Sequence, residues 1–192
     1  MGNGTGITFS PALTSAHASG ATVHGPLGTG LTLAEPLRQA HPAGSGVGIS
    51  GMTVTEAQSE FSLWASEAAP LIAGTDIADL AAPNLAIYEN RGVIAIDQDP
   101  LGIQASVVSN AGGQWVLEKP LADGSTAVAL FNAADTPWTQ ATVSLSSLGL
   151  GTRRTPYLVR DLWTGRTTVA FTSLAAGAVP PHGSTMVRIS AP

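Results

Sequence analysis

The chain has 192 residues, no cysteine, a formal net charge of −5, and 11% charged against 44% hydrophobic residues. A complete (β/α)₈ barrel with a second domain does not fit this length, because such a barrel alone takes roughly 250 residues. The absence of cysteine excludes disulfides, thiolate metal sites and cysteine nucleophiles. Lys119 is the only lysine among the eight basic residues, which we attribute to coding bias.

Targeting, membrane and cofactor signals are also missing from the sequence. The apolar runs fall far short of the ~20 residues that span a bilayer, so we expect no membrane contact. Residues 1–6 lack the basic region and apolar core of a signal peptide. The mild acidity shows no basic stripe, which argues against nucleic acid as a partner. The glycine-rich stretches 4–6 and 28–30 lack the helix and lysine of a phosphate loop, so we expect no cofactor.

Residues 1–47 form a Gly/Thr-rich segment with two ungapped copies of a 24-residue repeat. Each copy predicts a short strand (residues 7–9 in the first), a proline-containing bend and a second short strand. Two copies fall short of the three or so that a stable stack needs, so we expect weak order or packing on the rest of the chain. The repeated His17 and His41 suggest a metal site, with Glu35 as the nearby carboxylate. Turn or packing roles are favoured, and no metal site is expected.

Residues 48–104 have the helix, strand, helix rhythm of an α/β protein. Thr55 and Gln58 fit a capping box at the start of a helix. Pro70 ends that helix, and residues 71–73 are expected to form a short apolar strand. The apolar face of the helix is formed by Phe61, Trp64, Ala65, Ala68 and Ala69.

A second helix is predicted from Pro83 to about Asn90, because proline is favoured at the first helical position. Gly92 is interpreted as its C-cap, and residues 93–96 as another extended run. The Asp-Pro-Leu-Gly sequence of residues 99–102 indicates a turn.

Residues 105–192 alternate in hydrophobicity as an antiparallel β-domain does. Trp115 and Leu117 share one face of a strand, and Val187 and Ile189 share one face of the last strand. Six or more strands at this spacing indicate an antiparallel sandwich. The predicted strands are 114–118, 127–131, 141–145, 157–162, 168–171 and 185–189.

Six stretches of the chain carry a family resemblance. They are Val47–Thr53, Phe61–Ala65, Ala68–Asp76, Val93–Gly102, Val159–Trp163 and Val179–Gly183. In order and spacing they resemble the C-terminal portion of the α-galactosidases (melibiases) of glycoside hydrolase family 27, over about three quarters of the chain. The repeats look like linker or accessory segments of secreted actinobacterial hydrolases, which suggests a secreted bacterial type.

This resemblance implies an α+β fold and a class of substrate. Residues 48–104 would be the last helix, strand and helix of a (β/α)₈ barrel, and residues 105–192 the antiparallel β-sandwich that follows it. The family hydrolyses terminal α-galactosides with retention, so the implied partner is a carbohydrate and the implied location is extracellular.

The same resemblance implies that the catalytic groups are missing. A retaining glycosidase needs two carboxyl groups about 5–5.5 Å apart. In this family both aspartates come from the middle barrel strands, which lie upstream of this chain. We therefore assign no catalytic residue and expect a C-terminal fragment that is inactive alone. The alternatives are a non-catalytic carbohydrate-binding or accessory module, and a structural domain that completes a partner barrel.

Three other carboxylates are candidates to substitute for the missing pair. Asp97 and Asp99 are the closest pair in an apolar setting, and in an extended strand they would share a face about 7 Å apart. We favour instead a role for Asp99 in the turn before Pro100. Asp76 follows the expected barrel strand, where barrel enzymes keep functional loops, but a loop or helix-starting role is favoured there too.

Two further residue types invite a functional interpretation. His182 lies in a Pro-His-Gly bend beside Ser184, but a catalytic histidine needs a nucleophile and an orienting acid, so a turn or packing role is favoured. Trp115 and Trp163 are expected in the core. Trp138 follows a proline in a loop-like stretch, and it is the candidate for an exposed residue that stacks on a sugar.

Overall fold

The computed structural model divides the chain into two compact units, Met1–Gly51 and Met52–Pro192. The residues that it describes are 8–9, 32–33, 52–75, 77, 80, 82–151 and 154–192. In the first unit, β1 (Thr8–Phe9) and β2 (Thr32–Leu33) pair in parallel, with Thr8 opposite Thr32. These residues occupy the same position in the two repeat copies, as the sequence predicts for the first strand. The second strand of each copy, and with it His17, Glu35 and His41, lies outside the described residues.

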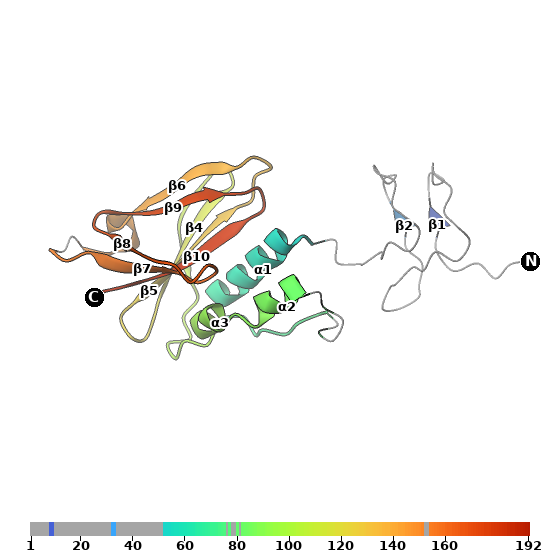
Figure 1. Ribbon diagram of the computed structural model, residues 1–192, viewed down its shortest axis with the longest axis horizontal. Helices are drawn as coiled ribbons and strands as arrows, with labels where there is room; N and C mark the ends of the chain where they lie inside the picture. The colour runs from blue at the N-terminus through green and yellow to red at the C-terminus, as the bar shows by residue number, and fades with distance from the viewer. Residues whose placement is uncertain are drawn as a thin grey trace, which may run out of the picture. The chain divides into compact units, whose positions relative to one another are not determined.

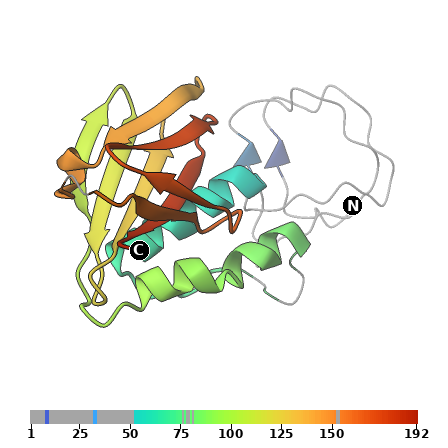
Figure 2. The same ribbon diagram turned by 60° about the vertical axis from the view of Figure 1, so that its left-hand side comes forward.

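The second unit has three layers, and the central one is a six-stranded antiparallel sheet in the order β3-β4-β5-β10-β7-β8 (Figures 1 and 2). The antiparallel pair β6-β9 covers one face of it, and three helices pack on the other. The strands are β3 (Ser106–Ala111), β4 (Gln114–Pro120), β5 (Thr126–Asn132), β6 (Trp138–Ser144), β7 (Tyr157–Asp161), β8 (Thr167–Ala170), β9 (Ser173–Val179) and β10 (Ser184–Ser190). The helices are α1 (Val54–Glu67), α2 (Ala82–Tyr88) and α3 (Arg91–Asp97), and a 3₁₀ turn, η2, spans Ser146–Leu148. The predicted sandwich is confirmed, with β3 and β9 as strands that the sequence did not predict.

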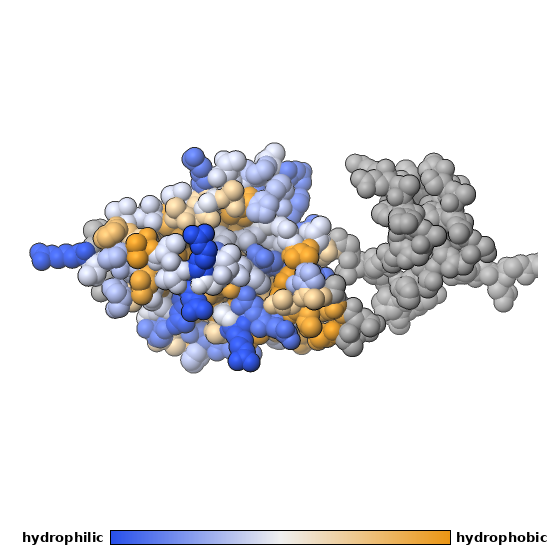
Figure 3. Space-filling view, viewed as in Figure 1, coloured by the Kyte–Doolittle hydropathy of each residue, from blue (hydrophilic) through white to orange (hydrophobic). Residues whose placement is uncertain are grey.

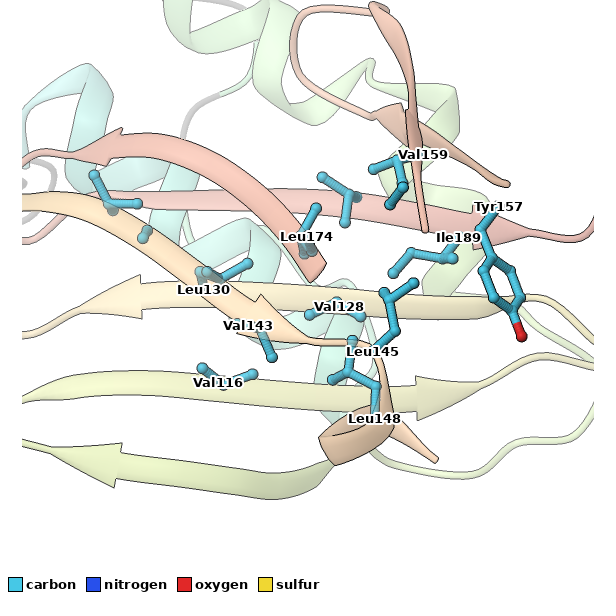
Figure 4. Close-up of a cluster of buried hydrophobic side chains, with 14 residues drawn as sticks. Val116, Val128, Leu130, Val143, Leu145, Leu148, Tyr157, Val159, Leu174 and Ile189 are labelled. Carbon is cyan, nitrogen blue, oxygen red and sulfur yellow. The ribbon is translucent and has the colours of Figure 1, made fainter. Parts of the chain in front are cut away.

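Alternation along the strands gives the central sheet a core on each face. Val128 and Leu130 of β5 point into the core between the two sheets, shown in Figure 4, whereas Ala127 and Ala129 face the helices. The small alanine side chains leave room for α1 to lie on the sheet, because neighbouring layers pack to the density of a crystal. The helices and the sandwich therefore share a buried core. That residues 48–104 and 105–192 are separate domains remains a prediction.

The helix α1 begins two residues before the predicted start. Its N-cap is Thr53, whose Oγ1 accepts a 3.2 Å hydrogen bond from the Glu56 N–H, while Glu56 Oε2 accepts one of 2.7 Å from the Thr53 N–H. The predicted cap at Thr55 is wrong. Two Thr-x-x-Glu/Gln patterns overlap here, Thr53 with Glu56 and Thr55 with Gln58, and the first is favoured because the Glu56 carboxylate also interacts favourably with the helix N-terminus. Gln58 instead donates to the Ser184 carbonyl at 3.2 Å.

The expected strand at residues 71–73 is not formed. Ala68 adopts a left-handed conformation (φ 52°) and ends α1, so Ala68 and Ala69 lie beyond the helix that was predicted to include them. The chain then continues without regular structure, and its one backbone hydrogen bond among the described residues joins the Ile72 N–H to the Pro70 carbonyl. A strand requires a neighbour that supplies backbone partners, and residues 71–73 have none in the described chain.

The second helix is confirmed as α2, but residues 93–96 are helical where an extended run was expected. Asn90 caps α3 by accepting hydrogen bonds from the Gly92 and Val93 N–H groups at 3.0 and 3.1 Å. Val93 and Ile96, three residues apart, are both buried on the same helical face. Gly92 is therefore inside the first turn of α3 instead of capping α2. Across the described residues, every helix is too short or too polar to cross a membrane.

Candidate functional site

The only lysine of the chain, Lys119 of β4, is buried against the C-terminal end of α1. Lys119 points from β4 toward the helices, is 2% exposed, and donates from Nζ to the Ala65 carbonyl at 2.9 Å. That carbonyl needs an outside donor because the Ala69 N–H, its usual partner, bonds to Trp64 at 3.2 Å. The ammonium also lies at the negative end of the helix dipole. Lys119 thus joins α1 to the sandwich.

Asp97 and Asp99 lie beside this lysine. Burial raises the pKa of the Asp97 carboxyl, and the positive charge of Lys119 partly opposes that rise. Burial lowers the pKa of Lys119, against the attraction of Asp97 and Asp99. The Oδ1 atom of Asp97 is buried and has no hydrogen-bond partner. The three residues form a partly buried charged cluster where α3, β4 and the end of α1 meet.

The extended arrangement of Asp97 and Asp99, the less favoured alternative, is not formed: Asp97 is the last residue of α3, and Asp99 lies in the following turn, as favoured from the sequence. Asp99 Oδ1 accepts 3.1 Å hydrogen bonds from the Leu101 and Ala122 N–H groups, and the Gly102 N–H closes the turn onto the Asp99 carbonyl at 2.9 Å. Asp99 therefore fixes the predicted turn and joins it to the β4–β5 hairpin.

An open groove of about 530 Å³ runs along the C-terminal half of α1, beside β3, β4 and β5. Its floor is apolar and includes the aromatic rings of Trp115 and Phe131. The polar residues at its border are Ser66, Glu67 and Gln104. Trp115 was expected in the core, and the structure instead leaves it half-buried on this groove.

The other tryptophans pack against the two cores. Trp163 was expected in a strand-like run, but it follows β7 in a turn, contacts the helix-side core, and donates from Nε1 to Ser62 Oγ at 3.1 Å. Trp138 was expected in a loop and is the first residue of β6, opposite Val179. Its ring is half-buried against the core between the sheets, which leaves part of it open to solvent.

His182 lies at the exposed bend between β9 and β10. It adopts φ 54°, its Nε2 lies 2.9 Å from Asp135 Oδ1, and its carbonyl accepts from Ser59 Oγ at 2.8 Å. Ser184 points the other way and donates to Ser62 Oγ at 3.1 Å inside the molecule. The histidine and serine that are neighbours in sequence are thus not brought together. Asp76 lies outside the described residues.

The described residues contain no group of three or more histidine, aspartate or glutamate side chains that could hold a metal ion. Sequence reasoning missed Lys119 as the centre of the polar cluster. The available signal was its place in β4, because residues 115, 117 and 119 alternate onto one face and a lone lysine on an apolar face requires a partner.

Two family models match the chain. The model named alpha galactosidase A matches residues 30–99, and that of the alpha galactosidase C-terminal beta sandwich domain matches residues 111–189. A probable alpha-galactosidase of Dictyostelium discoideum is 41% identical over 149 residues, which are 75% of this chain and 38% of that protein. The alpha-galactosidase of Coffea arabica is 37% identical over 140 residues, 73% of this chain and 36% of that protein. The chain therefore spans well under half the length of these relatives.

Solved structures agree with these matches. An alpha-galactosidase I from Mortierella vinacea superposes with a TM-score of 0.68 at 25% identity, over 77% of this chain and 40% of that one. A putative alpha-galactosidase/melibiase from Bacteroides fragilis gives 0.64 at 31% identity, over 73% and 29%. The fold and the matches define the C-terminal β-sandwich, with the helices before it, of a barrel glycoside hydrolase. The chain is similar to the C-terminal part of the α-galactosidases (melibiases).

Proposed function

We propose that this chain supplies the non-catalytic C-terminal part of a retaining α-galactosidase acting on terminal α-galactosides. The observation that carries the proposal is that two successive family models match the chain in order, over residues 30–99 and 111–189. The chain contributes the helices that end the barrel and the sandwich behind them, while the nucleophile and the acid/base come from barrel residues that it does not contain.

The contacts of Asp97 and Asp99 support our proposal that this chain does not itself catalyse hydrolysis. Asp99 accepts backbone hydrogen bonds with its carboxylate, and Asp97 lies beside the Lys119 ammonium. Two carboxyl groups that act on a glycosidic bond must face one another across the sugar. The isolated chain should therefore release no aryl alcohol from an aryl α-galactoside, and turnover that Asp97→Asn or Asp99→Asn abolished would refute this.

A fused polypeptide tests the positive half of the proposal. The fusion joins the N-terminal part of the Dictyostelium enzyme, up to its match to this chain, to residues 48–192 of this chain. Hydrolysis of an aryl α-galactoside by the fusion is then measured. We expect turnover by the fusion and none by either part alone. The thermal unfolding transition of the fusion is recorded in parallel, so that a folded but inactive fusion contradicts the proposed function.

The sugar specificity, the source and the location form part of the same proposal. Solved relatives also include a GH27 β-L-arabinopyranosidase from Geobacillus stearothermophilus, 25% identical with a TM-score of 0.67, so the fusion is assayed on aryl α-galactosides and β-L-arabinosides side by side.

A secreted bacterial parent is supported by the form of the repeats in residues 1–47. Detection of the parent enzyme in culture medium instead of in cells tests this location.

A carbohydrate-binding role of the sandwich is the second candidate, and the partly exposed ring of Trp138 favours it. Thr139 and Gln140, which follow it on β6, are exposed and polar, so they offer hydrogen-bonding groups beside an aromatic face. The test is retention of the chain on an immobilised galactoside column. Trp138→Ala should abolish retention, whereas Trp163→Ala, a tryptophan on the other core, should not.

A further inference from the structure

The two edge strands of the central sheet differ in how they are protected against further pairing. β3 carries a bulge between Val107 and Ser109, which interrupts regular pairing at that edge. β8 keeps an unbroken register with β7, and its residues, Thr167–Ala170, include no charge and no proline. The β8 edge therefore lacks the bulge, the charge and the proline that usually keep a sheet from gaining another strand.

The backbone of β8 presents free hydrogen-bonding groups at this edge. The Asp161 N–H donates to the Arg166 carbonyl at 2.8 Å, and bonded pairs alternate along an antiparallel ladder, so Thr168 bonds to β7. The N–H and C=O groups of Thr167 and Val169 therefore point away from β7. Neither residue has a backbone partner on that side among the described residues. These groups are available to a further strand.

Exposed apolar side chains accompany these free backbone groups. Leu158 and Val169 pair on the face of the sheet opposite to Ala170, which points into the core between the sheets. Both side chains are exposed, and so is that of Phe171, directly after the strand. Figure 3 shows hydrophobic residues where Figure 1 labels β7 and β8. A strand added at this edge would cover these side chains together with the free backbone groups.

The β8 strand is complementary to itself, which favours a second copy of this chain as the partner. Two identical antiparallel strands are related by a two-fold axis, which passes through a residue that lies opposite its own copy. That residue must have outward backbone groups, as Val169 has and Thr168 has not. Centring on Val169 also places Thr167 opposite Phe171 of the second copy. The paired segment carries no charge, so no like charges face each other.

We propose that the chain forms a two-fold symmetric dimer in which the β8 strands of two copies pair antiparallel about Val169. The two central sheets then become one continuous sheet. On one face, the side chains of Leu158 and Val169 from both copies form an apolar strip across four strands. Pairing ends at the dimer, because each copy uses its β8 edge and the bulge blocks the β3 edge. The inference goes beyond the proposed function and does not depend on it.

Analytical ultracentrifugation of the full chain over a concentration series tests the dimer. Val169→Lys places two like charges opposite each other at the centre of the proposed pair. Val107→Lys is the matched control, because Val107 is 56% exposed on the edge strand β3 and Val169 is 57% exposed on β8. We expect the wild-type chain and Val107→Lys to dimerise alike, and Val169→Lys to raise the dissociation constant about tenfold or more, as for a central interface residue. A monomeric wild-type chain, or equal weakening by both substitutions, would overturn the proposal.

Amide hydrogen exchange distinguishes strand pairing from association through another surface. The outward amides of Thr167 and Val169 should become protected as the protein concentration rises through the dimerisation range. The amide of Thr168, which faces β7, is the internal reference and should exchange at the same rate at every concentration. A dimer in which the amides of Thr167 and Val169 stay unprotected contradicts the proposal, because another surface then holds the two copies together.

Discussion

Replacement of Lys119 by methionine tests whether the sandwich caps α1 through a buried charge. Methionine keeps most of the volume and removes the donor to the Ala65 carbonyl, which has no other donor among the described residues. A hydrogen bond to a charged group contributes about 1.5–3 kcal/mol, while removal of the ammonium also removes the cost of burying it. We expect Lys119→Met to lower the free energy of unfolding by about 2 kcal/mol.

The pH dependence of this loss of unfolding free energy tests more directly whether Lys119 interacts with Asp97. Burial raises the pKa of Asp97 above its ordinary value, and Lys119 is the group that opposes the rise. A carboxyl whose folded pKa is raised destabilises the fold at neutral pH, and the penalty disappears as the pH falls through the folded pKa toward the unfolded one. The stability deficit of Lys119→Met should therefore shrink in mildly acidic solution, and adding Asp97→Asn should reduce it at neutral pH.

Urea unfolding followed by tryptophan fluorescence measures these differences at neutral and mildly acidic pH. Wild type, both single variants and the double variant form a thermodynamic cycle, which isolates the interaction of the two side chains. A loss of stability that is the same at both pH values, and the same with asparagine at position 97, would show that Lys119 does not interact with Asp97 and acts only as a hydrogen-bond donor.

Three further substitutions and one control, Thr55→Ala, test individual contacts by the same urea assay. Thr53→Ala should lower the free energy of unfolding by about 1 kcal/mol because it removes the observed cap of α1. Thr55→Ala should change that free energy by less than about 0.5 kcal/mol. Equal effects of the two substitutions contradict the assigned cap. Gly183→Ala should cost about 1–3 kcal/mol, since a Cβ there would lie 2.6 Å from Pro180 Cγ. Asn132→Ala should cost about 2 kcal/mol or more, since the two N–H groups of its Nδ2 serve three backbone carbonyls, one of them shared. A loss below that of Thr53→Ala contradicts this role.

The sequence predicts the sandwich well where strands alternate and turns carry their own signals. Thr126–Asn132 is a nearly continuous apolar run and Ser184–Ser190 alternates in part, and both are central strands whose side chains divide between the two cores. The turn at Asp99 was predicted because a short acidic side chain before a proline forms its hydrogen bonds locally. In these cases the structure is determined within a few residues of the pattern.

The β-branched run Val93–Ile96 was misassigned because strand propensity is weak against a cap and tertiary packing. Asn90 fixes the start of α3 and also donates from Nδ2 to the Leu162 carbonyl at 2.9 Å, a contact across 72 residues that no local pattern reveals. The strand Ser173–Val179 was missed for the converse reason. It is rich in alanine and glycine, and its strand geometry depends on pairing with β6 and on burial of Leu174 and Val179.

The charged cluster shows that one of the stretches that resemble the family is a structural junction. Val93–Gly102 places Asp97 at the end of one helix beside the lysine that caps another, and Asp99 in a turn bonded to the β4–β5 hairpin. From the sequence, a catalytic pair was the less favoured interpretation of these aspartates, and the turn role of Asp99 was preferred. The structure uses them to join helices to the sandwich, and such a junction can hold the two layers together whether or not a catalytic sheet is attached.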